Sequence, residues 1–266
     1  MEDLLLVIAK RLGFEPETSS DLAKASIAWS LFGALYSVPL VLAGLGWLGA
    51  VADAGLLRAE WPILLLLALF LFLFKRLSFF FFIESPGDEQ TRFNSTFEPI
   101  VTWSAVLSFG PTVLWIAVLA DLAAYGRRIR RAQSSIGRLD YIRDLLHNSA
   151  SITLVSLLAL VLYGRWGGVV PIPGFTLDAL LPALLATAAH VVLQTLLFVP
   201  MLLYVAVGWS PVFRQEKGWL STLTWGLGIT MVAIGLIELF AIMAAGLYVE
   251  NGPGVYLAFL LSLIHI

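Results

Sequence analysis

Residues 179–207 read ALLPALLATAAHVVLQTLLFVPMLLYVAV, and this stretch of 29 residues holds no Asp, Glu, Lys or Arg. An α-helix rises about 1.5 Å per residue, so about 20 apolar residues cross the roughly 30 Å hydrocarbon core of a bilayer. Within lipid, the backbone polar groups of such a stretch are satisfied when it is helical. The stretch therefore predicts a transmembrane helix.

The composition of the whole chain indicates the same class of protein. Its 266 residues are 59% hydrophobic and 13% charged, with a mean hydropathy of +0.90, whereas soluble domains are nearer half apolar and a quarter charged. The formal net charge of −2 gives no global basic field, which disfavours a nucleic-acid partner. The absence of cysteine excludes disulfides, thiolate metal sites and a cysteine nucleophile. We expect an all-α polytopic integral membrane protein.

About eight hydrophobic segments without Lys or Arg follow one another along the chain. They are Ser26–Val51, Trp61–Phe74, Phe97–Phe109, Pro111–Tyr125, Ser149–Tyr163, Ala179–Val207, Trp219–Tyr248 and Pro253 onward. The third and fourth are short and flank Gly110-Pro111, so they form either a hairpin or a single kinked helix. A hairpin of two short helices is expected to be buried among its neighbours.

The positive-inside rule favours the hairpin and a cytoplasmic N-terminus. With eight segments, fourteen of the sixteen Lys and Arg residues lie on the cytoplasmic side, and only Arg58 and Arg165 lie outside. The cytoplasmic set is Lys10, Arg11, Lys24, Lys75, Arg76, Arg92, Arg127, Arg128, Arg130, Arg131, Arg138, Arg143, Arg214 and Lys217. A single kinked pass would put Lys10, Arg11, Lys24, Arg92 and Arg165 outside.

Three regions are expected along the chain. Residues 1–24 form a cytoplasmic segment in which Leu4, Leu5, Ile8 and Leu12 share one helical face, typical of an interfacial helix; a disordered tail is the alternative. Residues 25–260 form the multipass membrane domain. Residues 261–266, LSLIHI, match the translation of a sequencing adapter, so we expect the native sequence to stop near Leu260 and the true protein to continue into the cytoplasm.

A basic cluster of Arg127, Arg128, Arg130 and Arg131 directly follows the fourth segment. Two interpretations stay open: a site for anionic lipid headgroups, or a topology anchor without a bound ligand. After it, apolar residues between Ile136 and Leu146 alternate with charged ones, which predicts an amphipathic helix lying on the cytoplasmic interface.

Polar residues inside the predicted membrane spans are the candidate site. Thr187, His190 and Gln194 share one face of the sixth segment, and Glu238 lies in the seventh. Because a short loop joins these two segments, a contact between His190 and Glu238 is feasible. The alternatives are a ligand-sensing or proton-sensing pocket and a structural contact between helices. A lone histidine is no metal site.

Two further carboxylates and one glycine motif have simpler interpretations. Asp121 is expected to pair with the basic cluster, and Glu98 to reach the interface. Gly44, Gly46 and Gly49 match a dinucleotide fingerprint but lie in an apolar helix, where glycines that allow close helix packing are expected. No catalytic spacing or phosphate loop is present in the sequence, so neither an enzyme nor a cofactor is predicted for this chain.

Residues 97–207 resemble the multipass membrane sensor modules that precede diguanylate cyclase (GGDEF) or HD-type phosphohydrolase domains in bacterial signalling proteins. The features that carry the resemblance are, in order, Phe109-Gly110-Pro111, the basic loop Arg127 to Arg131, Leu146-His147-Asn148, the run Tyr163-Gly164-Arg165-Trp166-Gly167-Gly168, and Gln194 with His190 beside it. They cover a little under half of the chain. Such proteins carry a cytoplasmic output domain; none is recognised within these 266 residues, as expected if the true protein continues beyond Leu260.

The resemblance implies a signal-input module in a bacterial cytoplasmic membrane, with cyclic dinucleotide turnover as the output. A homodimer is the usual habit of such receptors. A small transporter, or the substrate-binding subunit of an uptake system, is the alternative, because the broken hairpin and the mid-membrane polar face are features of transporter sites.

Overall fold

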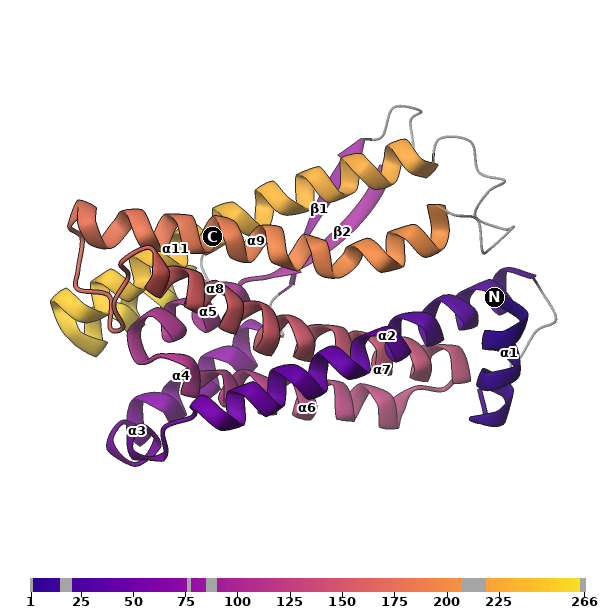
Figure 1. The fold of residues 1–266 in the computed structure, drawn as a ribbon, viewed down its shortest axis with the longest axis horizontal. Helices are drawn as coiled ribbons and strands as arrows, with labels where there is room; N and C mark the ends of the chain where they lie inside the picture. Colours follow the sequence, from indigo (N-terminus) through magenta and orange to yellow (C-terminus); the bar gives the residue numbers. More distant parts are fainter. Residues whose placement is uncertain (1, 15–20, 76–77, 85–89, 207–218, 264–266) are drawn as a thin grey trace.

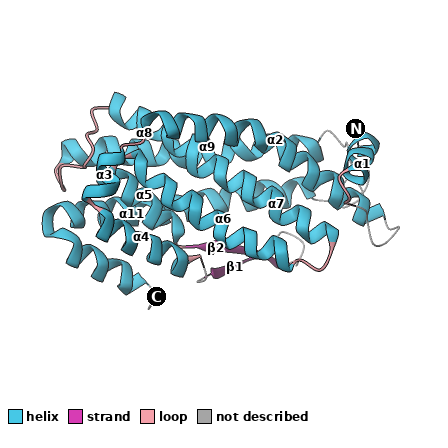
Figure 2. Ribbon diagram, turned by 90° about the horizontal axis from the view of Figure 1, so that it is seen from below, coloured by secondary structure: helices cyan, strands magenta, loops and turns pink. Residues whose placement is uncertain are grey.

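The computed structural model describes residues 2–14, 21–75, 78–84, 90–206 and 219–263, and these residues form a bundle of helices with one two-stranded hairpin (Figure 1). The helices are α1 (Glu2–Arg11), α2 (Asp21–Val51), α3 (Ala54–Ala59), α4 (Trp61–Phe74), α5 (Glu98–Phe109), α6 (Leu114–Arg131), α7 (Ser135–Ala150), α8 (Ser156–Arg165), α9 (Leu177–Ala206) and α11 (Trp219–Ser262). The long helices run along one axis of the bundle, with the hairpin at its side (Figure 2).

Four helices of the described chain are long and apolar enough to cross a membrane. They span Ala23–Val51, Ser135–Arg165, Leu177–Tyr204 and Met231–Ser262. Their outward surfaces carry large apolar side chains, among them Leu42 and Leu236, each more than half exposed. Exposed leucines on helices of this length suit a lipid environment. The chain is an integral membrane protein with several spans.

The strands β1 (Ser78–Glu84) and β2 (Gln90–Thr96) pair antiparallel, from Ser78 opposite Thr96 to Glu84 opposite Gln90. This hairpin lies where the sequence suggested only a cytoplasmic loop, so the all-α expectation holds for the bundle and not for this segment. The signal is present in the sequence: a run of four phenylalanines and an isoleucine favours a strand, and Ser85-Pro-Gly-Asp has turn composition.

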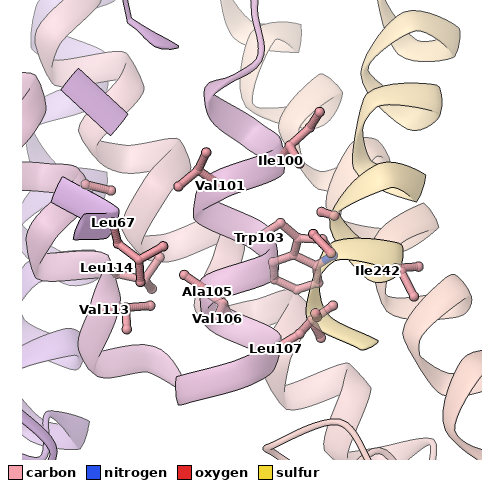
Figure 3. Packing of buried hydrophobic residues seen from close by; sticks show 14 of the residues in the cluster. Leu67, Ile100, Val101, Trp103, Ala105, Val106, Leu107, Val113, Leu114 and Ile242 are labelled. Carbon is pink, nitrogen blue, oxygen red and sulfur yellow. The ribbon is translucent and has the colours of Figure 1, made fainter. Parts of the chain in front are cut away.

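The break predicted at Gly110-Pro111, between the third and fourth hydrophobic segments, is present. Gly110 has φ 80° and ψ −169°, a conformation that suits glycine, and Pro111 opens a short 3₁₀ turn that leads into α6. Helices α5 and α6 are therefore separate, and a single kinked helix is excluded. Most of α5 is buried, including Val101, Trp103 and Leu107, which Figure 3 shows packed at the centre of the bundle.

Three turns that the sequence predicts to lie outside the membrane come together at one end of the bundle. Their hydrogen bonds run from Asp53 N to Thr112 Oγ1 (2.9 Å), from Ile172 N to Leu107 O (3.0 Å) and from Phe175 N to Glu250 Oε1 (2.9 Å). Gly252, with φ 78°, bends α11 at this same end, and the segment after it packs back against α5 through Tyr256, whose hydroxyl lies 2.9 Å from Ser104 Oγ.

The amphipathic segment after the basic cluster does not form a separate interfacial helix. Helix α7 continues through a π-helical turn, Ser151–Val155, into α8, so residues 135–165 form one candidate span. Its polar face is used within the protein: Arg143 pairs with Asp140 (3.2 Å) and donates to Ser30 Oγ of α2 (3.1 Å). Packing against α2 thus holds α7 in line with the span, because its polar residues find partners there.

The N-terminal helix is present as α1, and its buried face shares Leu5 and Ile8 with the predicted one. Leu5 and Ala9 pack in a cluster with Ile27 of α2, whereas Leu4 and Leu12 are 63% and 57% exposed. Helix α2 covers one side of α1, while Leu4 and Leu12 on another side stay exposed.

The glycine motif in α2 has a packing role at one position only. A Cβ on Gly44 would lie 2.1 Å from Thr153 Oγ1 in the π-helical turn, so glycine allows this close approach. At Gly46 and Gly49 nothing lies within 4 Å of such a Cβ, and the packing interpretation does not extend to them.

Candidate functional site

A polar cavity of about 190 Å³ lies between α5, α6, α9 and the helix formed by residues 135–165. Its lining residues, most of them polar, come from four segments of the chain: Glu98, Pro99, Thr102, Trp103, Asp121, Asn148, Ser151, Ile152, Ser156, His190 and Gln194. Two of the four predicted candidates, His190 and Gln194, line it directly. A pocket with a few convergent polar groups is the usual form of a small-molecule site.

His190 is held on both of its ring nitrogens. Its Nδ1 lies 2.7 Å from Glu238 Oε1 in α11, and its Nε2 lies 3.2 Å from Ser156 Oγ in α8. His190 is 4% exposed and Glu238 is fully buried. The contact between the sixth and seventh segments, feasible from the sequence, is therefore confirmed. Glu238 does not line the cavity; it orients the imidazole that does.

Thr187 also acts through a neighbour. Its Oγ1 accepts a hydrogen bond from Trp103 Nε1 at 2.8 Å, and the Trp103 ring stacks on the His190 ring with centroids 4.8 Å apart and planes 6° from parallel. Trp103 is 1% exposed. Thr187 thus fixes an indole that forms one wall of the cavity, which sequence reasoning did not identify.

Two of the lining residues, Glu98 and Asp121, belong to an ionic triad that the sequence did not reveal. Lys75, directly after α4, pairs with Glu98 of α5 (2.6 Å between Nζ and Oε1) and with Asp121 of α6. Lys75 is 9% exposed and Asp121 is fully buried. The predicted pairing of Asp121 with the basic cluster is wrong. Asp121 pairs with Lys75, because α4 and α6 pack together. Glu98 likewise pairs with Lys75 and does not simply reach the interface.

Two buried oxygen atoms of the cavity lining, one of them in the triad, have no partner among the described residues. Among the described residues, neither Asp121 Oδ2 nor Thr102 Oγ1 has a hydrogen-bond partner, although both atoms are buried. Buried polar atoms in proteins are nearly always satisfied. Two carboxyl groups also share a single ammonium, so the lining keeps free acceptor capacity.

The helical periodicity of α6 places three of the four arginines of the basic cluster on one face and the fourth on another. Arg127, Arg128 and Arg131 line a second cavity, of about 310 Å³, whereas Arg130 does not. Lys75 lines this second cavity, while its two partners line the first. The triad therefore stands between the two cavities.

The described residues contain no group of three or more His, Cys, Asp or Glu that could hold a metal ion. No protein-family model, curated protein or solved structure matches the chain.

Proposed function

We propose that this chain is the membrane-embedded signal-input module of a bacterial signalling protein, and that its polar cavity receives a small cationic ligand. The supporting observation is Asp121 Oδ2, a buried carboxyl oxygen of the cavity lining that has no hydrogen-bond partner in the part of the chain that the structure describes. A buried charge is stabilised by an opposite charge and by hydrogen bonds. A protonated amine supplies both.

The size of the cavity limits the ligand. A dry cavity of about 150 Å³ in another protein admits benzene, so a volume of about 190 Å³ admits a molecule of up to roughly eight non-hydrogen atoms. Gln194 and Asn148 add amide groups to the lining, which suit a ligand with a second polar group. Small amino alcohols and short polyamines meet both conditions.

A route from the cavity toward the cytoplasm supports a signalling role. Ser151 and Ile152 line the cavity and belong to the π-helical turn, and α7 extends from this turn to the basic cluster. Single π-helical turns occur often at functional sites. Ligand contact there would bias the register of α7. Cyclic dinucleotide turnover as the output, and a homodimer, follow from the family resemblance alone.

Proteoliposomes separate this proposal from its alternative. Radiolabelled ethanolamine, a probe of the proposed class, is expected to bind up to about one molecule per chain and not to accumulate further. A transporter or uptake subunit remains the second candidate because the triad separates two cavities, an arrangement that suits a gate. Uptake that exceeds the number of chains and is released by permeabilising the vesicles would favour transport and contradict a pure sensor.

The proposed orientation has its own test, because the chain contains no cysteine. An Arg165→Cys variant is expected to react with a membrane-impermeant maleimide in intact cells, since Arg165 lies at the outer end of α8. An Arg138→Cys variant, at the cytoplasmic end of α7, is expected to react only after permeabilisation. Both side chains are exposed in the structure, so burial does not interfere. The opposite labelling pattern would mean that the chain is oriented in the membrane the other way round.

A further inference from the structure

The second cavity forms a basic groove between the end of α4 and the last turns of α6. It is lined by Phe72, Lys75, Ala124, Arg127, Arg128, Arg131, Ala132 and Tyr141. On an α-helix, positions 124, 127, 128 and 131 lie on one face. Arg130 lies off this face and outside the lining. The three lining arginines thus converge on one place, which a simple topology anchor does not require.

Aromatic rings position two of these arginines, Arg127 and Arg128. Among the described residues, no ion pair joins Arg127, Arg128 or Arg131 to Asp or Glu. The Arg127 guanidinium carbon lies 4.8 Å from the centroid of the Phe72 ring, and its Nε donates to Ala123 O. The Arg128 guanidinium carbon lies 5.2 Å from the Tyr125 ring centroid. Stacking on an aromatic face limits the motion of a guanidinium and leaves its terminal N–H groups to donate.

Exposed leucines lead up to the groove on α4, one of the helices that flank it. Leu65 and Leu69 are 62% and 61% exposed, and they share one helical face with Phe72 of the groove lining. An apolar surface on α4 therefore continues from the concentration of positive charge in the groove. That order of surfaces matches a phospholipid, with its phosphate at the arginines and its acyl chains along the leucines.

We propose that this groove binds the phosphate headgroup of an anionic phospholipid of the cytoplasmic leaflet. Guanidinium groups pair with phosphate oxygens through two parallel hydrogen bonds, a geometry that lysine cannot supply. A free phosphate would use the arginines and make no use of the leucines. The lipid assignment therefore predicts that affinity depends on the acyl chains as well as on the charge.

Native mass spectrometry of the full chain in an uncharged detergent tests this. Dihexanoyl phosphatidylglycerol is the probe, and dihexanoyl phosphatidylcholine and inorganic phosphate are the comparisons. The R127Q/R128Q/R131Q variant is expected to lose about 100-fold in affinity for phosphatidylglycerol, at about fivefold for each cation. The matched control R11Q/R130Q/R138Q removes the same charge outside the groove and is expected to stay within about threefold of the wild type.

Three results would overturn the proposal. Equal losses in the two triple variants would mean that charge acts without a site. Equal affinity for the phosphatidylcholine would show that the groove does not recognise the negative charge of the headgroup. Inorganic phosphate that binds as tightly as the lipid, with the same dependence on the three arginines, would make this an anion site independent of lipid. If the triple variant fails to fold, R128Q against R130Q gives the same comparison with one charge each.

Discussion

A Lys75→Met variant is expected to unfold about 10 °C below the wild type in detergent. The substitution leaves Glu98 and Asp121 with no counter-ion in the interior of the bundle, where Asp121 is fully buried. Removing one partner of a buried ion pair typically costs about 3–5 kcal/mol. For a domain of this size each kcal/mol corresponds to about 2–4 °C. The nine tryptophans provide the unfolding signal by fluorescence.

An exposed pair elsewhere in the chain supplies the control. Lys24 lies 3.3 Å from Asp21, and both side chains are accessible, at 41% and 83%. Exposed pairs contribute about 0–1 kcal/mol, so Lys24→Met is expected to shift the midpoint by no more than about 3 °C. A second variant, K75M/E98Q/D121N, removes the charges together and is expected to regain most of the lost stability. If Lys75→Met unfolds like Lys24→Met, the triad is not a buried ionic cluster.

Much of the architecture follows from the position of charged and apolar residues in the sequence. The long span containing His190 is predicted because no charge interrupts it, and the break at Gly110-Pro111 because positive residues must stay on one side. The contact of His190 with Glu238 follows in turn, since two long helices joined by a short connection pack side by side.

The parts that sequence reasoning missed depend on contacts between distant segments. Lys75 follows an apolar run, and a lysine in that position usually marks the membrane interface. Only the packing of α4 against α5 and α6 brings Glu98 and Asp121 to it, across 23 and 46 positions of the chain. Trp103 was likewise one aromatic residue among many until α5 placed it between Thr187 and His190. The predicted placement of this amphipathic helix on the cytoplasmic interface was wrong for the same reason. The polar face of α7 contacts Ser30 of α2, a residue distant in the sequence.

An Asp121→Asn variant is expected to bind ethanolamine about 10- to 100-fold more weakly than the wild type, the range for one hydrogen bond to a charged group. The substitution removes the negative charge at the cavity wall and leaves Lys75 paired with Glu98, one cation with one carboxylate. The fold should therefore survive, and the loss should fall on the ligand. Ethylene glycol, equal in size to ethanolamine and uncharged, is expected to bind neither protein measurably.

Asp178→Asn is the matched control, because it makes the same chemical change at an exposed position at the start of α9, outside the cavity lining. Unchanged binding in this variant would assign the effect to Asp121 and not to net charge.

The most direct test of a cation site in the polar cavity is equilibrium binding of ethanolamine to the wild-type protein and to these two variants, measured in detergent by isothermal titration calorimetry. We expect saturable binding at one site per chain in the wild type and in Asp178→Asn, and weakened or lost binding in Asp121→Asn. Absence of binding to the wild type, or equal binding to all three proteins, would contradict it.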